Sequence, residues 1–237
     1  MKQTLFLVLA LGISFFFIAA SARGQTGPVI AIDIALDPDQ AVEDRVRAMN
    51  AELKRNYPRG YALDATHRAH VTMLERYVRT ADLNKIYGAA SAVMSKEDVV
   101  HWKLTGEGYF SLTADGVGVL MMAVKRTPDL VRLQQELIAA VAPFTVKRGN
   151  TAAFFTTPED PDIVPWMVRY VATYVPKASG DNFVPHVTIG VANVLFAEKL
   201  AAQPFDPTSF SPSGASVYQV GNYGTARKEL YLLPLSP

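Results

Sequence analysis

Two copies of the tripeptide His-Val-Thr constrain this chain more than any other feature, because each begins a run that fits a half-buried strand. Residues 70–72 form the first copy and residues 186–188 the second, and apolar residues follow both. Alternate side chains of a strand share a face, so each histidine should point the same way as its threonine. The predicted front pairs are His70 with Thr72 and His186 with Thr188. The residues predicted to lie behind them are Val71, Met73, Val187, Ile189 and Val191.

Hydropathy patterns predict strands and helices along the rest of the chain. Extended runs are expected over residues 29–36, 70–78, 99–113, 117–125, 186–194, 217–220 and 229–233. Helices are expected over residues 39–57, 80–94, 127–141, 163–174 and 195–202, with Thr80 as a cap of the second. These elements do not repeat as regular βαβ units, which favours an antiparallel α+β arrangement over a doubly wound sheet. Each half holds a helix, a loop and then a His-Val-Thr strand.

The first 22 residues are typical of a secretory signal peptide. Lys2 is followed by an apolar run over residues 5–18, and Ala20-Ser21-Ala22 matches the small-x-small pattern that signal peptidase accepts. The run is short for a bilayer core of about 30 Å, so a cleaved signal is favoured over a retained anchor. We expect cleavage after Ala22, or alternatively after Gly24, and export to the periplasm or the medium. No membrane anchor is expected after cleavage.

The remainder, residues 28–237, has the length of a single domain or of two small lobes that share an interface. We expect it to be a monomer. The chain has no cysteine, which excludes disulfides, thiol catalysis and thiolate metal sites. Its net charge of +1 provides no basic field for long nucleic acid. A small substrate or the phosphate at an RNA end remains compatible with this charge.

The paired motifs hold the groups that metal-free phosphoryl chemistry needs. Imidazole titrates near neutrality, so one histidine can act as a base while a second, protonated one acts as an acid. The threonine hydroxyls can donate hydrogen bonds to phosphate oxygens, and phosphoryl transfer depends mainly on positioning and charge stabilisation. A single such histidine is more often a surface or satisfied core residue. The occurrence of two copies is what indicates a function.

The pair of motifs, the second within Val184-Pro185-His186-Val187-Thr188-Ile189-Gly190, resembles the two-histidine (2H) phosphoesterase superfamily, which includes the bacterial 2′-5′ RNA ligase and cyclic phosphodiesterase proteins. Residues 217–227 also resemble the C-terminal strand and turn of some members. The resemblance implies a bilobal α+β fold of two antiparallel sheets, with outer helices and a central cleft that carries both motifs. It implies metal-independent attack on 2′,3′-cyclic phosphates or related phosphodiesters, without a cofactor. His70 and His186 would be the acid/base pair, and Thr72 and Thr188 the phosphate donors.

Other residues are weaker candidates. Four aromatic residues could stack on a nucleobase, although aromatic residues in strands usually fill the core: Tyr109, Phe110, Tyr174 and Tyr223. Arg227 follows a glycine-containing turn and could meet a phosphate, although a solvated turn is the more common situation. His67 is expected to be a satisfied loop residue and not a metal ligand, because we identify no carboxylate at ligand spacing in the same segment and the chain has no cysteine. His101 is expected to be a partly buried sheet residue.

Three functional classes follow. The favoured one is a phosphodiesterase that acts on 2′,3′-cyclic phosphates or on small nucleotide or RNA-end phosphodiesters. The second is an exported binding module that holds a phosphorylated ligand in the same cleft without turnover. The third is a structural protein in which the motif pair is a coincidence, and it requires the two imidazoles to lie on unrelated surfaces. Neither the natural substrate nor the choice between hydrolysis and ligation follows from the sequence.

Overall fold

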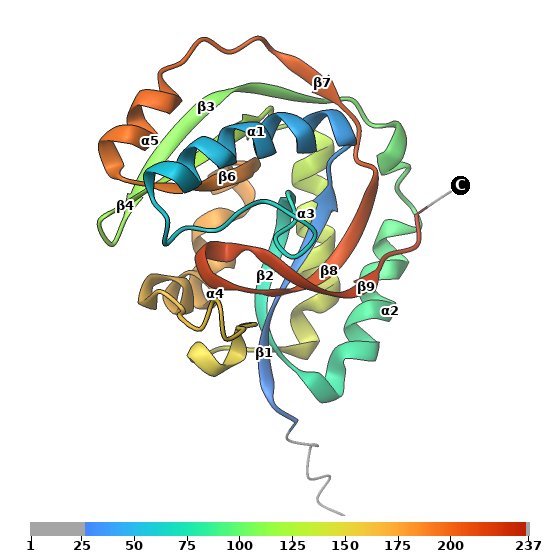
Figure 1. The fold of residues 1–237 in the computed structure, drawn as a ribbon. Helices are drawn as coiled ribbons and strands as arrows, with labels where there is room; N and C mark the ends of the chain where they lie inside the picture. Colours follow the sequence, from blue (N-terminus) through green and yellow to red (C-terminus); the bar gives the residue numbers. More distant parts are fainter. Residues whose placement is uncertain (1–26, 236–237) are drawn as a thin grey trace, which may run out of the picture.

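The computed structural model describes residues 27–235, which form an antiparallel sheet with helices on its outer sides (Figure 1). The expected signal peptide, residues 1–22, lies outside the described residues. Among the described residues, no helix combines the length and the apolar character needed to cross a bilayer.

The elements agree closely with the pattern expected for an α+β chain. The strands are β1 (Val29–Asp37), β2 (Val71–Arg79), β3 (Leu104–Ala114), β4 (Val117–Val124), β5 (Thr145–Val146), β6 (His186–Ala192), β7 (Thr208–Phe210), β8 (Gly214–Val220) and β9 (Ala226–Leu232). The helices are α1 (Gln40–Asn56), α2 (Leu83–Met94), α3 (Pro128–Val141), α4 (Pro165–Ala178) and α5 (Val194–Ala201). Asp39 caps α1 by accepting from the amide of Val42, and Thr127 caps α3 by accepting from the amide of Leu130.

Two local expectations are wrong. Thr80 does not cap α2, because residues 80–82 form a 3-10 turn that leads into the helix without a side-chain cap. The strand expected from residue 99 begins only at Leu104, because Val99–His101 is another 3-10 turn. His101 is therefore not a sheet residue: its side chain is 76% exposed, and its Nδ1 lies 2.6 Å from Oδ1 of Asp98.

The strands form one nine-stranded sheet and not two separate sheets. Its order is β7-β3-β4-β6-β2-β1-β8-β9, and β5 pairs with β2 off this path. The halves β7-β3-β4-β6 and β2-β1-β8-β9 join through a single pair, Val71 with Val187. The two halves of the sheet correspond to the two expected lobes. We call their junction the seam, because only one residue pair continues the ladder between them.

The two halves repeat the same register around the His-Val-Thr strands. On β2, Thr72 pairs with Ala35 and Leu74 with Ile34, so Met73 is an extra residue in the ladder. On β6, Thr188 pairs with Met121 and Gly190 with Leu120, so Ile189 is extra in the same way. Each strand thus has a β-bulge directly after its threonine, and a bulge turns consecutive side chains to one side of the sheet. The residues that pair across the seam, Val71 and Val187, are the central residues of the two tripeptides.

Helix α1 supports the second bulge. The amide of Asn50 donates to the carbonyl of Ile189 at 2.9 Å and to that of Tyr61 at 3.1 Å. Its Oδ1 accepts from the amide of Leu63 at 2.8 Å, and the residue is only 2% exposed. A bulge leaves backbone groups out of the ladder, and this buried amide satisfies one of them. A Cβ on Gly190 would lie 2.7 Å from Nδ2 of Asn50, so glycine is what allows α1 to approach here.

Candidate active site

The two motifs meet in one cavity beside the seam. The cavity has a volume of about 270 Å3 and is lined by residues from β2, β3, β4, β6 and α4 and from the turn before β9. Its lining includes His70, Thr72, His186 and Thr188, and further Glu75, Leu112, Val119, Met121, Trp166, Met167, Tyr170 and Tyr223. The structure therefore brings together all four residues that the sequence singled out for chemistry.

The bulges alter the simple alternation that was expected. Met73 and Ile189 lie behind the motifs as predicted, and both are completely buried. Val191, however, pairs with Val119, a residue that lines the cavity. Paired residues of antiparallel strands share a face, so Val191 is on the cavity side and not behind it. The extra residue at Ile189 shifts the alternation by one position.

Both histidines are held in the same way. Nδ1 of His70 lies 2.8 Å from the carbonyl oxygen of Arg68, and Nδ1 of His186 lies 2.7 Å from that of Val184. A carbonyl oxygen only accepts, so Nδ1 carries the proton in both rings. In each case the carbonyl belongs to the residue two positions earlier, which fixes the ring and leaves Nε2 for chemistry. The anchoring through Nδ1 is therefore the same in both rings.

A buried carboxylate makes the pair unequal. Asp33, on β1, is 1% exposed, and its Oδ2 lies 3.2 Å from Nε2 of His70. The same oxygen accepts the hydroxyl hydrogen bond of Thr72 at 2.7 Å. Within residues 27–235, the hydroxyl of Thr188 makes no hydrogen bond. The polar groups of the first motif thus contact a protein carboxylate, whereas the hydroxyl of the second motif is free to bind a ligand.

The pKa values of the histidines diverge accordingly. Burial acts to lower the pKa of His70, but the hydrogen bond and the charge of Asp33 outweigh it, so the pKa is raised. Burial lowers the pKa of His186, and the nearby charge of His70 adds to this effect. One imidazole therefore favours its protonated form and the other its neutral form, a pattern suited to acid/base division of labour.

A second carboxyl lies beside the first. Glu75 is 2% exposed, lines the cavity and pairs with Asp33 across the β1–β2 ladder. Burial, and then the charge of Asp33, raises its pKa well above the ordinary value of 4.5. Among the described residues, Oδ1 of Asp33 and Oε2 of Glu75 are buried without a hydrogen-bond partner. Glu75 thus places a buried carboxyl in the cavity wall, directly beside the buried carboxylate of Asp33.

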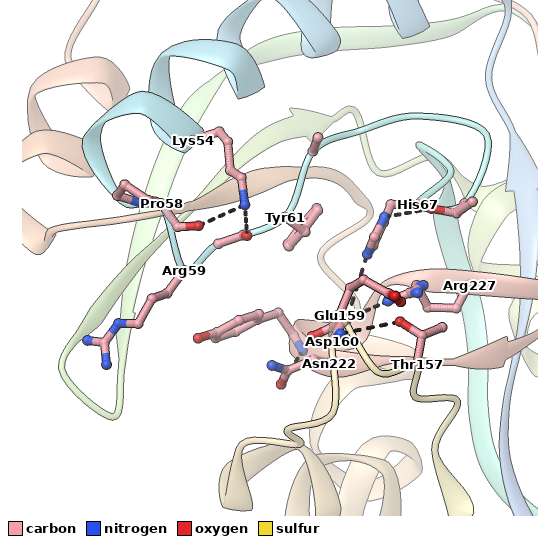
Figure 2. Close-up of a pocket in the computed structure, with 14 residues that line it drawn as sticks. Lys54, Pro58, Arg59, Tyr61, His67, Thr157, Glu159, Asp160, Asn222 and Arg227 are labelled. Atoms are coloured by element: carbon pink, nitrogen blue, oxygen red, sulfur yellow. Dashed lines mark hydrogen bonds and ion pairs between the residues drawn. The ribbon is translucent and has the colours of Figure 1, made fainter.

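Tyr223 lines both this cavity and a larger one of about 460 Å3. Figure 2 shows residues that line the larger cavity. The larger cavity contains Tyr61, whose ring stacks on His67 at 5.4 Å and faces Tyr223 at 6.3 Å. Tyr223 has a positive φ of 56°, a backbone strain that often accompanies a functional turn. Tyr223 is therefore placed where a substrate-binding role was expected.

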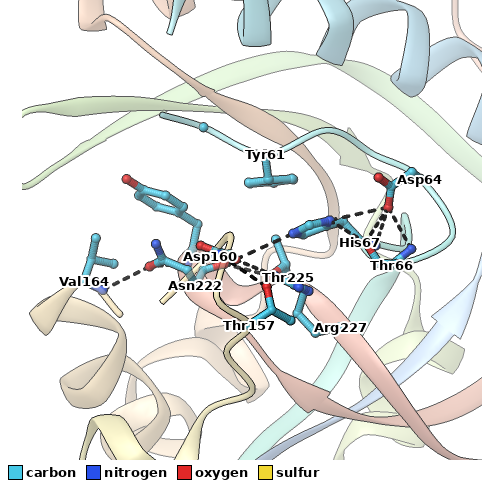
Figure 3. Close-up of polar contacts among 12 residues, drawn as sticks. Tyr61, Asp64, Thr66, His67, Thr157, Asp160, Val164, Asn222, Thr225 and Arg227 are labelled. Carbon is cyan, nitrogen blue, oxygen red and sulfur yellow. Dashed lines mark hydrogen bonds and ion pairs between the residues drawn. The ribbon is translucent and has the colours of Figure 1, made fainter. Parts of the chain in front are cut away.

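Arg227 and His67 belong to the larger cavity, joined by polar contacts (Figure 3). Arg227 forms an ion pair with Asp160 and is 9% exposed, so its turn is not solvated as expected. His67 does have carboxylates nearby, contrary to expectation: Nδ1 lies 3.5 Å from Asp64 and Nε2 lies 3.8 Å from Asp160. Over residues 27–235, however, no group of three or more histidine, aspartate and glutamate side chains is arranged to hold a metal ion.

Tyr109 does not reach the histidine cavity. Its hydroxyl accepts from Nε of Arg45 on α1 at 3.0 Å, and its ring packs edge-on against Phe205 at 4.8 Å. The next residue, Phe110, contacts the ring of His186 instead, with centroids 5.9 Å apart. Neighbouring residues of a strand face opposite sides, so of these two adjacent candidates Tyr109 is wrong and Phe110 lies beside the histidine.

Sequence reasoning missed Asp33 and Glu75. A signal for Asp33 was present, because one charged residue interrupts the apolar run VIAIDIAL of residues 29–36. Charged residues are rarely buried without a partner, so this interruption pointed to a paired or functional group. No comparable signal identified Trp166, Met167 and Tyr170, which reach the cavity from α4.

The site defines a class of protein: an antiparallel α+β fold with two His-x-Thr strands around one cavity. A model of the 2'-5' RNA ligase superfamily matches residues 37–219, and the chain belongs to that superfamily. This membership supports an enzyme of the phosphoesterase type. A search of curated proteins found no match.

A solved structure shows the same fold. The crystal structure of TT0787 of Thermus thermophilus aligns with a TM-score of 0.52 at 13% identity, covering 86% of this chain and 97% of that one. The structure of E. coli LigT complexed with ATP aligns with a TM-score of 0.49 at 15% identity, covering 89% of this chain and all (100%) of that one. At these identities the likeness concerns the fold alone.

Proposed function

We propose that the protein is a metal-independent phosphodiesterase that hydrolyses 2′,3′-cyclic phosphates or related small nucleotide or RNA-end phosphodiesters. The observation that carries this proposal is the matched geometry of the two motifs. Both histidines are anchored through Nδ1 to a carbonyl two residues earlier, and both present Nε2 beside one cavity. This arrangement supplies a base and an acid on the two sides of a single phosphorus atom.

The reaction needs two proton transfers. Water attacks phosphorus as one histidine accepts the water proton at Nε2. The bond between phosphorus and a ribose oxygen breaks, and that oxygen takes the proton from Nε2 of the other histidine. The product is a phosphomonoester, and the two histidines have exchanged their protonation states, which exchange with solvent restores. Such transfer contributes about 10²- to 10⁴-fold to a rate.

The hydroxyl of Thr188 is free to donate to a phosphate oxygen. Thr72 has one hydroxyl hydrogen, which the structure directs to Asp33. It donates to substrate only if that hydrogen rotates away. We therefore assign phosphate binding first to Thr188.

Tyr223 offers a route for the rest of the substrate. Its side chain borders both cavities, so a phosphodiester at the histidines extends past this ring toward Tyr61 and His67. Stacking on such rings tolerates any base. Arg227 is already paired with Asp160, so we assign it to holding the turn and not to direct contact with a phosphate.

The test is hydrolysis of 2′,3′-cyclic nucleotides by the mature protein in EDTA, beside His70→Ala and His186→Ala. We expect a bell-shaped pH–rate profile and a loss of about 10²-fold or more in kcat in each variant. Full activity of the double variant would exclude the mechanism. Tight binding of a cyclic nucleotide without product would instead support the non-catalytic binding module.

We also propose that the protein is exported after cleavage near residue 22 and that it acts as a monomer. The apolar run over residues 5–18 and the Ala-Ser-Ala sequence support export. Mass spectrometry of the N-terminus from a periplasmic or culture fraction tests it, and recovery of the uncleaved chain from the cytoplasm would contradict it. Light scattering of the mature protein tests the monomer.

A further inference from the structure

The repeated register identifies which residues of one half have no chemical counterpart in the other. Counting from each bulge, Asp33 and Glu75 pair on β1 and β2 where Val119 and Val191 pair on β4 and β6. The backbone is the same on both sides of the seam, and the side chains are two carboxyls on one side and two valines on the other. The asymmetry of the site therefore originates at a single pair of positions.

In the half with the two carboxyls, Asp33 contacts both residues of the first motif that face the cavity. One oxygen of Asp33 meets both Nε2 of His70 and the hydroxyl of Thr72, at 3.2 and 2.7 Å. Burial of an ionised carboxylate is costly unless charge and hydrogen bonds compensate it. The imidazole and the hydroxyl are the compensating groups. Within residues 27–235, the matching place in the other half, on the His186 side, holds Val119 and no carboxylate.

We propose that Asp33 is a positioning residue whose carboxylate keeps His70 protonated and so makes His70 the proton donor and His186 the proton acceptor. This inference rests on the proposed function. It deepens that function by assigning a direction to the acid/base pair, which the equal anchoring of the two rings leaves open. The leaving ribose oxygen then lies on the β2 side of the cavity, and the attacking water lies on the β6 side.

Other charged and titratable groups near His70 do not replace the contact that Asp33 makes with its ring. Asp37 on β1, His186 on β6 and Tyr218 on β8 lie close enough to act on His70. Glu75 on β2 and Tyr170 on α4 line the same cavity. Asp37 accepts from Ser216 and Tyr218, each at 2.7 Å. Glu75 favours its neutral form because burial raises its pKa. Asp33 is thus the carboxylate in direct contact with the ring.

The experiment is an NMR titration of the histidine rings in the mature protein and in Asp33→Asn. Asparagine has the same shape, and its Oδ1 can take the place of Asp33 Oδ2, where it still accepts from Thr72 and from protonated His70. The variant therefore removes the negative charge and keeps the local geometry. In the wild type we expect His70 to titrate at higher pH than His186. In Asp33→Asn we expect the midpoint of His70 to fall, with that of His67 unchanged as an internal control.

Glu75→Gln is the matched control, because it alters the adjacent carboxyl without touching His70. We expect it to move the His70 midpoint far less than Asp33→Asn does. Equal shifts in the two variants, or an unchanged His70 in Asp33→Asn, would overturn the assignment. So would a wild-type protein in which His186 titrates above His70. None of these readouts requires turnover, so they are separate from failure of the proposed function.

Kinetics supply a second measurement once a substrate is turned over. Asp33→Asn should lose activity at those pH values at which His70 is protonated in the wild type and neutral in the variant. We expect kcat/KM of Asp33→Asn to fall by about tenfold or more near pH 8, and to stay within about threefold of wild type near pH 5.5. A uniform loss across this range would indicate a structural role and overturn the proposal.

Discussion

The amide of Asn50 connects helix α1 to the bulge that orients Thr188, and removing it should destabilise the protein measurably. Asn50→Ala deletes two donated hydrogen bonds and one accepted hydrogen bond, to Ile189, Tyr61 and Leu63. Each net contribution is about 1 kcal/mol, and the site is too buried for water to replace the lost partners easily. We expect the free energy of unfolding to fall by about 3 kcal/mol.

Urea denaturation followed by circular dichroism measures this change. The matched control is Asn56→Ala at the end of the same helix, where the exposed Oδ1 accepts a single bond from the amide of Asn193. We expect that variant to lose about 1 kcal/mol or less. If Asn50→Ala costs no more than Asn56→Ala, the bulge does not depend on α1, and our account of the position of Thr188 is refuted.

Three further changes test other parts of the site. Gly190→Ala should cost about 1–3 kcal/mol in urea denaturation, because its Cβ would lie 2.7 Å from Nδ2 of Asn50; no loss would mean that α1 moves freely. Folding raises the pKa of Glu75, so the folded state keeps this proton as pH rises above 4.5 and stability falls in that range. Glu75→Gln lacks this cost. The free energy of unfolding of Glu75→Gln minus that of the wild type should therefore rise between about pH 5 and about pH 7, by at most about 1.4 kcal/mol per pH unit. A difference that does not change with pH would contradict this account of Glu75. Tyr223→Ala should raise KM for a cyclic nucleotide about tenfold while Tyr223→Phe does not, and equal KM values would remove the stacking role.

The sequence predicted much of the fold because the decisive signals are local. The alternation around both His-Val-Thr runs and the start of the helix expected over residues 127–141 each involve only a few adjacent residues. The single sheet was not predictable in this way. Its two halves join through one pair, Val71 with Val187, whose residues lie far apart in the chain, and no local pattern indicates such a contact.

The candidate site was predictable in its histidines and threonines and not in its surroundings. Tyr109 and Phe110 are adjacent aromatic residues, and only the register of β3 decides which one faces His186. The bulges are equally hidden, since an extra residue at Met73 or Ile189 changes which side chains face the cavity without any change in composition.

The repeated register also explains why the two motifs differ after the threonine. The first continues with Leu74 and the second with Gly190, and these residues occupy equivalent places after their bulges. In the first half the place is filled by a leucine side chain that is 1% exposed. In the second half Asn50 and Leu53 fill it from α1 and leave no room for a Cβ. The departure from a common motif is therefore a difference in what covers the strand, and it leaves the cavity side, where His70 and His186 are anchored alike, unaffected.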